Sequence, residues 1–303
     1  MVDRPKRLRR CELSVPGSSE KMMAKAASLD VDYVFLDLED AVAPSAKREA
    51  RGKIVEALRS HDWRAKTLAV RVNDLTTEYA HEDIIEVVEG AGDRLDVVVL
   101  PKAMGADDIA FVDKLLAMIE KKHKRTTRIG LEVLIEEVEA MMRVEEIAAA
   151  SPRLEALIFG MGDYSASQGV SIKDVGGNEG YPGDIWHYQR QKLTIAARAH
   201  KLDAVDGPYA NFRDPEGYRE ECRRAMTLGM VGKWAIHPSQ VETAQDVFSP
   251  RQEEVDRARA MMAAYDEALA RGEGAVQYEG KMIDIASVRI VRNVVDRADM
   301  IGM

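Results

Sequence analysis

Short apolar segments alternate with longer amphipathic segments along most of the chain. The apolar segments are rich in Leu and β-branched residues without clean alternation, which is typical of strands covered on both faces. Eight of them occur, at residues 12–17, 33–40, 67–73, 96–102, 129–136, 155–163, 202–208 and 233–238. The intervening segments carry apolar residues at spacings of three and four, which predicts helices, as at residues 18–28, 46–60, 107–125 and 188–201.

Eight repeats of a strand followed by a helix indicate an α/β protein with a (β/α)8 TIM barrel. The repeat ends near residue 248, which is close to the size of about 250 residues typical of such a barrel. We therefore predict a catalytic barrel domain at residues 1–248. An open doubly wound sheet is the alternative that the same pattern allows.

The chain continues past the predicted barrel through residues 249–303. Residues 248–274 contain a Ser-Pro pair at their start and two Gly at their end, and this predicts a capped helix of several turns. Residues 280–295 are apolar again and need a surface to bury against. We expect residues 249–303 to form a helical extension or lid that packs on a neighbouring subunit.

Composition and charge exclude some classes of partner. Of the 303 residues, 46% are hydrophobic and 31% are charged, and the formal net charge is −9. An acidic chain of this kind offers no concentrated cationic face to nucleic acid. No stretch approaches the roughly 18 apolar residues of a membrane span, so we expect no membrane partner.

The cellular compartment is read from cysteine usage and from the first ten residues. Cys11 and Cys222, far apart in the sequence, suggest a reducing cytoplasm rather than a disulfide framework. The opening MVDRPKRLRR is basic, but no apolar core of a signal peptide follows it. We expect a solvated arm there, with a short basic targeting peptide as the alternative.

Polar residues gather where the predicted strands end. In a (β/α)8 barrel, the active site forms at the carboxyl ends of the strands. The residues at those positions are Pro16, Gly17, Ser18, Asp37, Glu39, Asp40, Arg71, Asn73, Lys102, Glu132, Glu136, Asp163, Asp206 and His237. Several carboxylates at one mouth repel one another, which predicts a bound cation. Oxygen ligands without cysteine or clustered histidine indicate Mg²⁺ or Mn²⁺.

Glu136 and Asp163, which follow consecutive predicted strands, are the expected metal ligands. Asp37, Glu39 and Asp40 are expected to support them by orienting metal-bound water and by fixing Arg or Lys partners. A single acid at a strand end can instead be a helix N-cap or part of a loop salt bridge. For Asp40 in particular, a cap on the helix that begins near residue 46 is the alternative.

The cationic residues of the mouth are Arg71, Lys102 and, when protonated, His237. Arg71 has apolar neighbours on both sides, and its planar fork suits a carboxylate or a developing enolate oxygen. A buried ion pair with one of the acids is the alternative for Arg71. Lys102 follows the same logic. His237 precedes a proline, and either a catalytic or a hydrogen-bonded core histidine fits that position.

Nine segments of the chain carry a resemblance to a known family. In chain order they are ELSVPGS, FLDLEDAVAPSAKREAR, RVN, LPK, LEVLIE, SPRLEALIFGMGDYSAS, AVDGPY, GKWAIHPSQ and KMIDIAS. Together they run from about residue 10 to about residue 290. The chain resembles the citrate lyase β-subunit family of acyl-CoA lyases (the HpcH/HpaI aldolase superfamily), and within it the malyl-CoA and β-methylmalyl-CoA lyase branch.

This resemblance implies a Mg²⁺-dependent barrel enzyme that cleaves or forms a carbon–carbon bond beside a coenzyme A thioester. It implies that Glu136 and Asp163 bind the metal, and that Arg71 holds the thioester carbonyl as it becomes an enolate. It further implies that Asp284 of KMIDIAS is the catalytic acid/base, supplied by a neighbouring subunit of a homotrimer or homohexamer.

The substrate implied by the resemblance is malyl-CoA or β-methylmalyl-CoA, with glyoxylate and acetyl-CoA or propionyl-CoA as products. Pro16, Gly17, Ser18, Lys102 and His237 are expected to contact this substrate or its coenzyme A moiety. A citramalyl-CoA lyase and a (3S)-malyl-CoA thioesterase are alternatives within the family. Alternatives of other classes are a noncatalytic coenzyme A-binding subunit of a complex and an aldolase that acts on free 2-oxo acids.

Overall fold

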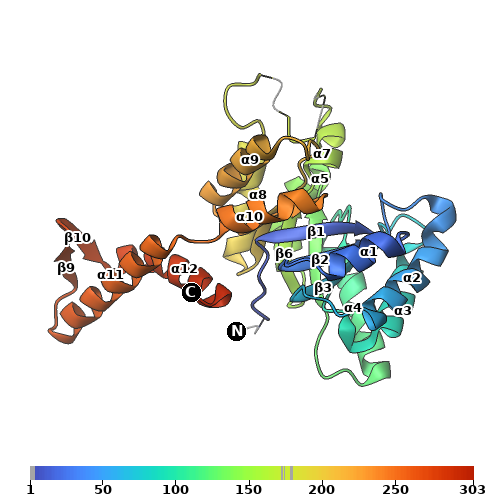
Figure 1. Ribbon diagram of the computed structural model, residues 1–303, viewed down its shortest axis with the longest axis horizontal. Coiled ribbons are helices and arrows are strands. Elements are labelled where there is room, and N and C mark those ends of the chain that lie inside the picture. The colour runs from blue at the N-terminus through green and yellow to red at the C-terminus, as the bar shows by residue number, and fades with distance from the viewer. Residues whose placement is uncertain (1–3, 172, 174, 178–179) are drawn as a thin grey trace. The chain divides into compact units, whose positions relative to one another are not determined.

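Eight parallel strands close into a barrel in the first of two units of the chain (Figure 1). The computed structural model describes residues 4–171, 173, 175–177 and 180–303. The strands are β1 (Cys11–Pro16), β2 (Tyr33–Asp37), β3 (Thr67–Arg71), β4 (Val97–Leu100), β5 (Gly130–Ile135), β6 (Leu154–Phe159), β7 (Asp203–Asp206) and β8 (Gly232–Ala235). Each strand pairs with the next, and β8 pairs with β1. The predicted (β/α)8 barrel is thus confirmed and the open doubly wound sheet is wrong.

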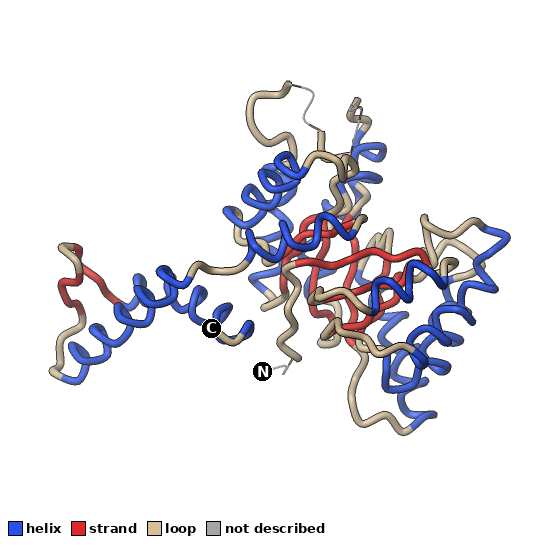
Figure 2. The backbone as a smooth tube through the Cα atoms, viewed as in Figure 1, coloured by secondary structure: helices blue, strands red, loops and turns tan. Residues whose placement is uncertain are grey.

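Helices surround the strands of this barrel, as Figure 2 shows in blue and red. They are α1 (Glu20–Ala27), α2 (Lys47–Ser60), α3 (Ala80–Ala91), α4 (Ala106–His123), α5 (Val138–Met142), α6 (Val144–Ala149), α7 (Met161–Gln168), α8 (His187–Ala199), α9 (Pro215–Thr227) and α10 (Val241–Phe248). Short 3-10 turns η1 (Pro44–Ala46), η2 (Gly92–Arg94) and η3 (Pro238–Gln240) join some of them. Every residue of β2, β3, β5 and β6 is buried, which explains why these strands lack polar alternation.

The inside of the barrel is filled by residues at every second position of the strands. Phe35 of β2 packs against Trp234 of β8, two strands away, with their ring centroids 4.4 Å apart. Because side chains alternate between the two faces of a strand, residues two positions after this apolar cluster also face inward. This period places Asp37 one inward-facing position beyond Phe35, toward the carboxyl end of the barrel. Arg71 and Glu136 lie at the same end, which is the mouth of the barrel.

The same period explains why two acids predicted at the mouth lie elsewhere. Asp206 follows the inward-facing Val205, so its side chain faces the helix layer, where Arg190 of α8 donates to both of its oxygens at 2.9 and 3.0 Å. Glu132 faces inward but lies lower in the barrel, where its Oε1 accepts a hydrogen bond from Arg9 Nε at 2.8 Å. Placing either acid at the mouth was therefore wrong.

The second unit, Val247–Met303, contains two helices and a small sheet. Helix α11 (Gln252–Ala270) confirms the capped helix, and α12 (Ile285–Ile301) follows strands β9 (Ala275–Tyr278) and β10 (Lys281–Asp284). The strands pair antiparallel, so the extension is not wholly helical as expected. The missed signal was the Glu279-Gly280 pair, whose φ angles of 46° and 75° suit a two-residue hairpin turn.

A small apolar core holds this second unit together. Tyr265 of α11, Ile283 of β10 and Val288 of α12 are buried against one another. The partly buried Met261, Met262, Val276 and Tyr278 pack around them. Among the described residues of the whole chain, none of the helices has the length and apolarity needed to span a bilayer.

Candidate active site

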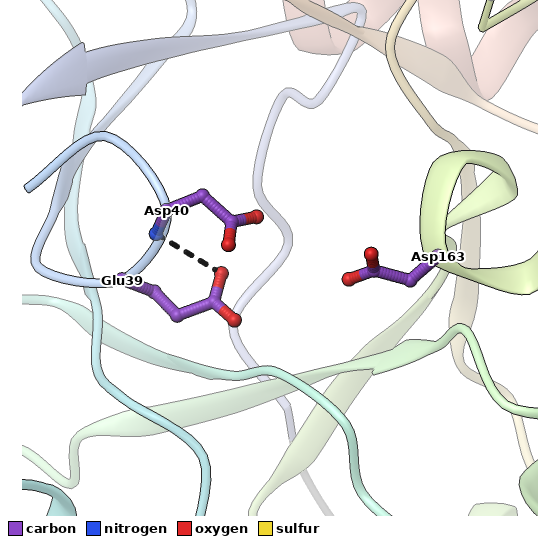
Figure 3. Close-up of side chains that lie close together, drawn as sticks. All are labelled: Glu39, Asp40 and Asp163. Atoms are coloured by element: carbon purple, nitrogen blue, oxygen red, sulfur yellow. Dashed lines mark hydrogen bonds between the residues drawn. The ribbon is translucent and has the colours of Figure 1, made fainter. Parts of the chain in front are cut away.

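Three acids, two from a loop and one from the start of a helix, converge at the carboxyl end of the barrel. Glu39 and Asp40 follow β2, and Asp163 lies in the first turn of α7, which follows β6. One carboxylate oxygen from each lies within 4.8 Å of those from the other two, and Figure 3 shows Asp163 facing the other two acids. Such a set of oxygen donors suits a hard divalent cation. Of the two predicted ligands, Asp163 belongs to this group.

Glu136, the other predicted ligand, lies beside the group at the end of β5. Its Oε1 accepts a hydrogen bond from the backbone N–H of Lys102 at 2.8 Å, and Lys102 adopts a positive φ of 47°. A Cβ atom at Gly160 would lie 2.5 Å from Glu136 Oε2, so only glycine leaves room for the carboxylate there. Burial raises the pKa of Glu136 to about 8, and the nearby Asp163 and Glu39 act in the same direction.

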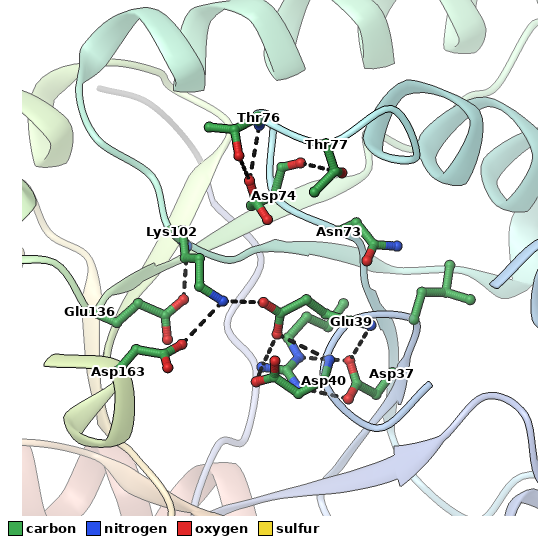
Figure 4. Close-up of polar contacts among 12 residues, drawn as sticks. Asp37, Glu39, Asp40, Asn73, Asp74, Thr76, Thr77, Lys102, Glu136 and Asp163 are labelled. Carbon is green, nitrogen blue, oxygen red and sulfur yellow. Dashed lines mark hydrogen bonds and ion pairs between the residues drawn. The ribbon is translucent and has the colours of Figure 1, made fainter. Parts of the chain in front are cut away.

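Lys102 bridges the acids of the two sides of the site, as Figure 4 shows. Its Nζ contacts a carboxylate oxygen of Glu39 and lies 3.1 Å from Asp163 Oδ2. Burial alone would lower the pKa of Lys102, but the contact with Glu39 outweighs it and raises that pKa. The side chain is therefore an ammonium ion, and it supplies positive charge where the acids converge.

Arg71 is held by acids from the neighbouring strand. Its Nε and Nη2 each lie 2.7 Å from an oxygen of Asp37, and its Nη1 lies 2.8 Å from Glu39. The guanidinium also lies over the ring of Trp234, with 5.5 Å between its carbon and the ring centroid. The buried ion pair, which was the alternative for Arg71, is thus present, and it also fixes the plane of the guanidinium.

Asp37 organises the loop that carries Glu39 and Asp40. Besides binding Arg71, its carboxylate accepts hydrogen bonds from the backbone N–H groups of Glu39 at 2.9 Å and Ala41 at 3.0 Å. Burial would raise the pKa of Asp37, but the Arg71 guanidinium outweighs burial and holds that pKa below its usual value. The alternative that Asp40 caps the next helix is wrong, because Ala46 occupies the N-cap position of α2.

The site carries more negative than positive groups. Five carboxyl groups (Asp37, Glu39, Asp40, Glu136 and Asp163) meet two cationic side chains (Arg71 and Lys102). The raised pKa of Glu136 is a consequence of this imbalance together with burial. The residues present therefore fit a divalent cation, which would offset most of the excess negative charge.

Other predicted contact residues lie around the same end of the barrel. Gly17 follows β1 and donates its N–H to the carbonyl of Asp37 at 2.9 Å, and a Cβ at Gly17 would lie 2.7 Å from that oxygen. Pro16 pairs with Asp37 in the sheet, and Ser18 follows Gly17. His237 caps η3 and stacks on Phe212 with the ring centroids 4.6 Å apart. Its ring is half-buried, so the core-histidine alternative is wrong.

Asp284 lies in the second unit, at the end of β10. Its Oδ1 accepts hydrogen bonds from the backbone N–H of Ser287 at 3.0 Å and from its hydroxyl at 3.1 Å, so that Asp284 caps α12. These hydrogen bonds, the backbone one first, lower the pKa of Asp284. The side chain is exposed. An exposed carboxylate on a small, separately packed unit is accessible to a second chain.

Sequence reasoning missed two residues that build the site. Trp234 supplies the aromatic face under Arg71, and its position inside an apolar strand gave no separate signal. Lys47 binds the backbone of the loop that carries Glu39. The available signal was a lysine in the first turn of a helix, where a positive charge is unfavourable.

Comparison with known proteins gives consistent results over the whole chain. A family model described as HpcH/HpaI aldolase/citrate lyase matches residues 10–238, and one described as a C–C bond lyase of the TIM-barrel fold matches residues 183–303. The L-malyl-CoA/β-methylmalyl-CoA lyase of Cereibacter sphaeroides is 44% identical over 98% of this chain and 97% of that protein. The malyl-CoA/β-methylmalyl-CoA/citramalyl-CoA lyase of Chloroflexus aurantiacus is 34% identical over 95% of this chain and 87% of that protein.

A solved structure extends this likeness to three dimensions. Protein CitE of Mycobacterium tuberculosis, in complex with magnesium, acetoacetate and coenzyme A, is 28% identical and superposes with a TM-score of 0.75. The match covers 95% of this chain and 97% of that chain. This chain therefore belongs to the HpcH/HpaI aldolase/citrate lyase family.

Proposed function

We propose that this protein is a Mg²⁺-dependent carbon–carbon lyase that cleaves malyl-CoA or β-methylmalyl-CoA to glyoxylate and acetyl-CoA or propionyl-CoA, or condenses the same compounds in reverse. The observation that carries the proposal is the excess of carboxyl groups at the barrel mouth beside the buried Arg71. The identity of 44% to a lyase of that name supports the choice of substrate. The magnesium and coenzyme A bound to the related CitE structure support the cofactor and the thioester.

Glu136 and Asp163 are the proposed metal ligands, and Glu39 and Asp40, whose carboxylate oxygens lie close to those of Asp163, are proposed to orient metal-bound water. Mg²⁺ commonly takes only one or two carboxylates from a protein and fills its other positions with water and substrate. When bound, Mg²⁺ or Mn²⁺ supplies Lewis-acid chemistry that lowers the pKa of the substrate hydroxyl. Asp37 acts indirectly, by orienting Arg71 and the loop of Glu39.

Two residues of the protein are proposed to stabilise the negative charge of the intermediate and to transfer its proton. The substrate hydroxyl loses its proton to solvent and becomes the aldehyde carbonyl of glyoxylate as the carbon–carbon bond breaks. The electron pair of that bond passes to the α-carbon of the thioester and forms an enolate. Arg71, already oriented by Asp37, stabilises the negative oxygen of that enolate. Asp284 returns a proton to the α-carbon, or removes it in the condensation direction. We propose that Asp284 comes from a neighbouring subunit of a homotrimer or homohexamer.

The remaining proposals concern substrate contacts, domains and location. Pro16, Gly17, Ser18, Lys102 and His237 surround the mouth and are proposed to contact the substrate or its coenzyme A moiety. Residues 1–248 form the proposed catalytic domain, and residues 249–303 the extension that completes a neighbour's site. The two free, buried cysteines suit a reducing compartment, and we propose a cytoplasmic location.

The test is the product pattern from malyl-CoA in the presence of Mg²⁺. A lyase releases equal amounts of glyoxylate and acetyl-CoA, which are measured as the glyoxylate phenylhydrazone and by chromatography. Malate and free coenzyme A without glyoxylate would show a thioesterase instead. Pyruvate formed faster from citramalyl-CoA than glyoxylate from malyl-CoA would favour the citramalyl-CoA alternative. Coenzyme A binding without turnover of any of these thioesters would support the noncatalytic alternative.

A further inference from the structure

Lys47 is a buried lysine in a position that local physical chemistry disfavours. It is the first residue of α2, and a positive charge at the start of a helix opposes the helix dipole. Only 7% of the residue is exposed, and burial lowers the pKa of Lys47. A charged residue that is unfavourable both for the helix dipole and for burial is expected to make a compensating tertiary contact.

That contact is a complete set of hydrogen bonds around the ammonium group. Lys47 Nζ donates to the carbonyl oxygens of Leu38 at 2.8 Å and Glu39 at 2.9 Å. It also donates to Asn73 Oδ1 at 2.6 Å. An ammonium has three N–H donors, and these three acceptors, all of them neutral, use every one. Two of the three belong to the backbone of the loop that carries Glu39 and Asp40.

The third acceptor, Asn73, is itself rigidly held. Asp83 of α3 accepts hydrogen bonds from the Asn73 backbone N–H at 3.0 Å and from its side-chain Nδ2 at 2.5 Å. The other oxygen of Asp83 accepts from Arg51 Nε of α2 at 2.7 Å. This network turns Asn73 Oδ1 toward Lys47 and ties the ammonium to two helices and the end of β3.

Hydrogen bonds thus hold the loop that carries Glu39 and Asp40 on two sides. On the barrel side, the Leu38 N–H donates to the carbonyl of Arg71 at 2.9 Å, and on the helix side Lys47 holds the carbonyls of Leu38 and Glu39. The carboxylates of Glu39 and Asp40 project from this held peptide toward Asp163. One carboxylate oxygen of each acid lies within 4.8 Å of one from Asp163, and both acids are attached to this peptide.

We propose that Lys47 is a positioning residue for the divalent-cation site, acting through the backbone of Leu38 and Glu39 to hold Glu39 and Asp40 in register with Asp163. This inference rests on the proposed function, because it requires a divalent cation at these acids. Without Lys47, the buried carbonyl of Leu38 loses its donor and the carbonyl of Glu39 keeps only the N–H of Val42 at 3.2 Å, so the peptide moves to regain hydrogen bonds. The acids would then have to be reordered each time a cation binds.

The experiment is a calorimetric titration, in which Mg²⁺ alone is added to the purified full chain and the heat of binding is measured. Lys47→Met keeps the length of the side chain and removes its donors. Lys53→Met is the matched control, because Lys53 lies on the same helix and contacts the exposed Glu49 at 2.6 Å. We expect the Mg²⁺ dissociation constant to rise at least about tenfold in Lys47→Met. The control should stay within about twofold of the unchanged protein.

Turnover separates positioning from a merely structural role. With malyl-CoA as substrate, excess Mg²⁺ should bring kcat of Lys47→Met back to within about threefold of the unchanged protein. A variant that is simply less stable would show a lower melting temperature with an unaltered Mg²⁺ dissociation constant at 25 °C, and that result overturns the inference. A kcat that stays low at saturating Mg²⁺ overturns it as well.

Two further outcomes keep the inference apart from the proposed function. If the unchanged protein binds no Mg²⁺, both fail together; if it binds Mg²⁺ and Lys47→Met binds equally well, only the inference fails. Should Lys47→Met not fold, Asn73→Ala takes its place, since it removes one acceptor of Lys47 and keeps the lysine. We expect about threefold weaker Mg²⁺ binding in Asn73→Ala, and unchanged binding there overturns the inference.

Discussion

Arg71 and Asp37 form a bidentate ion pair across neighbouring strands at the mouth of the barrel. They are direct register partners of β3 and β2, and both nitrogen–oxygen distances are 2.7 Å. Because paired residues on adjacent strands face the same side, the fork of the arginine meets the carboxylate in one plane. The pair fixes the plane of the guanidinium, whose remaining edge contacts Glu39 through Nη1 at 2.8 Å.

Replacing Arg71 with lysine should keep the charge and lose this fixed direction. We expect kcat for malyl-CoA cleavage to fall by about 10²–10³-fold, the usual effect of losing a preorganised donor to a developing oxyanion. The Mg²⁺ dissociation constant should change little. The measurement is steady-state kinetics at saturating Mg²⁺, with Arg64→Lys at an exposed ion pair as the control. A kcat close to that of the unchanged protein would remove Arg71 from the mechanism.

Glu136 should make the metal-free protein less stable as the pH rises. Its pKa is raised from 4.5 to about 8 in the folded protein, so between these values the folded state binds more protons than the unfolded state. The free energy of unfolding therefore falls with pH in that window, by about 1 kcal/mol per pH unit. Glu136→Gln should lose this component of the slope. Urea unfolding in EDTA from pH 5 to pH 8 measures the difference between the two proteins.

The comparison with Glu136→Gln is needed because other buried acids also titrate. Glu12 and Glu132, inside the barrel, have pKa values raised first by burial and then by a nearby carboxylate, which is Glu132 for Glu12 and Glu155 for Glu132. They contribute a slope common to both proteins. Only the difference between the two slopes reports on Glu136. Equal slopes would show that Glu136 is already ionised at neutral pH without a metal.

Asp163 should bind the metal, and its loss should weaken metal binding without unfolding the protein. Its side chain is partly exposed, so Asp163→Asn removes a charge without creating a cavity. We expect the Mg²⁺ dissociation constant of Asp163→Asn to rise by about 100-fold. In the unchanged protein, EDTA should abolish turnover, and added Mg²⁺ should restore it. Asp107→Asn is the matched control, since Asp107 is an exposed acid in the first turn of α4. Calorimetric titration with Mg²⁺ measures both variants, and unchanged binding in Asp163→Asn would assign the metal to other acids.

The pattern of residues predicted the strands and part of the site for a clear physical reason. Buried strands need continuous apolar runs, and these runs end where the chain reaches the mouth, so Asp37 and Arg71 could be placed from the sequence. The sequence says less about how far along the barrel axis a side chain lies and whether it faces the barrel interior or the helix layer. Asp206 lies one position off the inward-facing period, and Glu132 lies too low in the barrel, although both belong to the same apolar runs.

Residues whose side chains bind the backbone of the site were the hardest to predict from the sequence. Lys47 binds two carbonyl groups, and any carbonyl can serve as an acceptor, so no partner could be read from the sequence. The hairpin of β9 and β10 was missed because each strand has only four residues, too few to show a period beside two long helices. The family resemblance supplied Asp284, which a pattern of apolar and polar residues could not single out.

Asp284 should donate a proton to a site on another chain, and two inactive variants should therefore restore each other. We expect Asp284→Asn alone to lower kcat by about 10²–10⁴-fold and to stop exchange of the acetyl-CoA α-hydrogens with deuterium from the solvent. Asp296→Asn is the control, because Asp296 is an exposed acid of α12, the helix that Asp284 caps. When Asp284→Asn and Arg71→Lys chains are co-expressed, mixed oligomers contain sites with an intact Arg71 from one chain and an intact Asp284 from the other. Activity well above that of either variant alone is the expected result, and a mixture no more active than its components would place Asp284 at the site of its own chain or outside the mechanism.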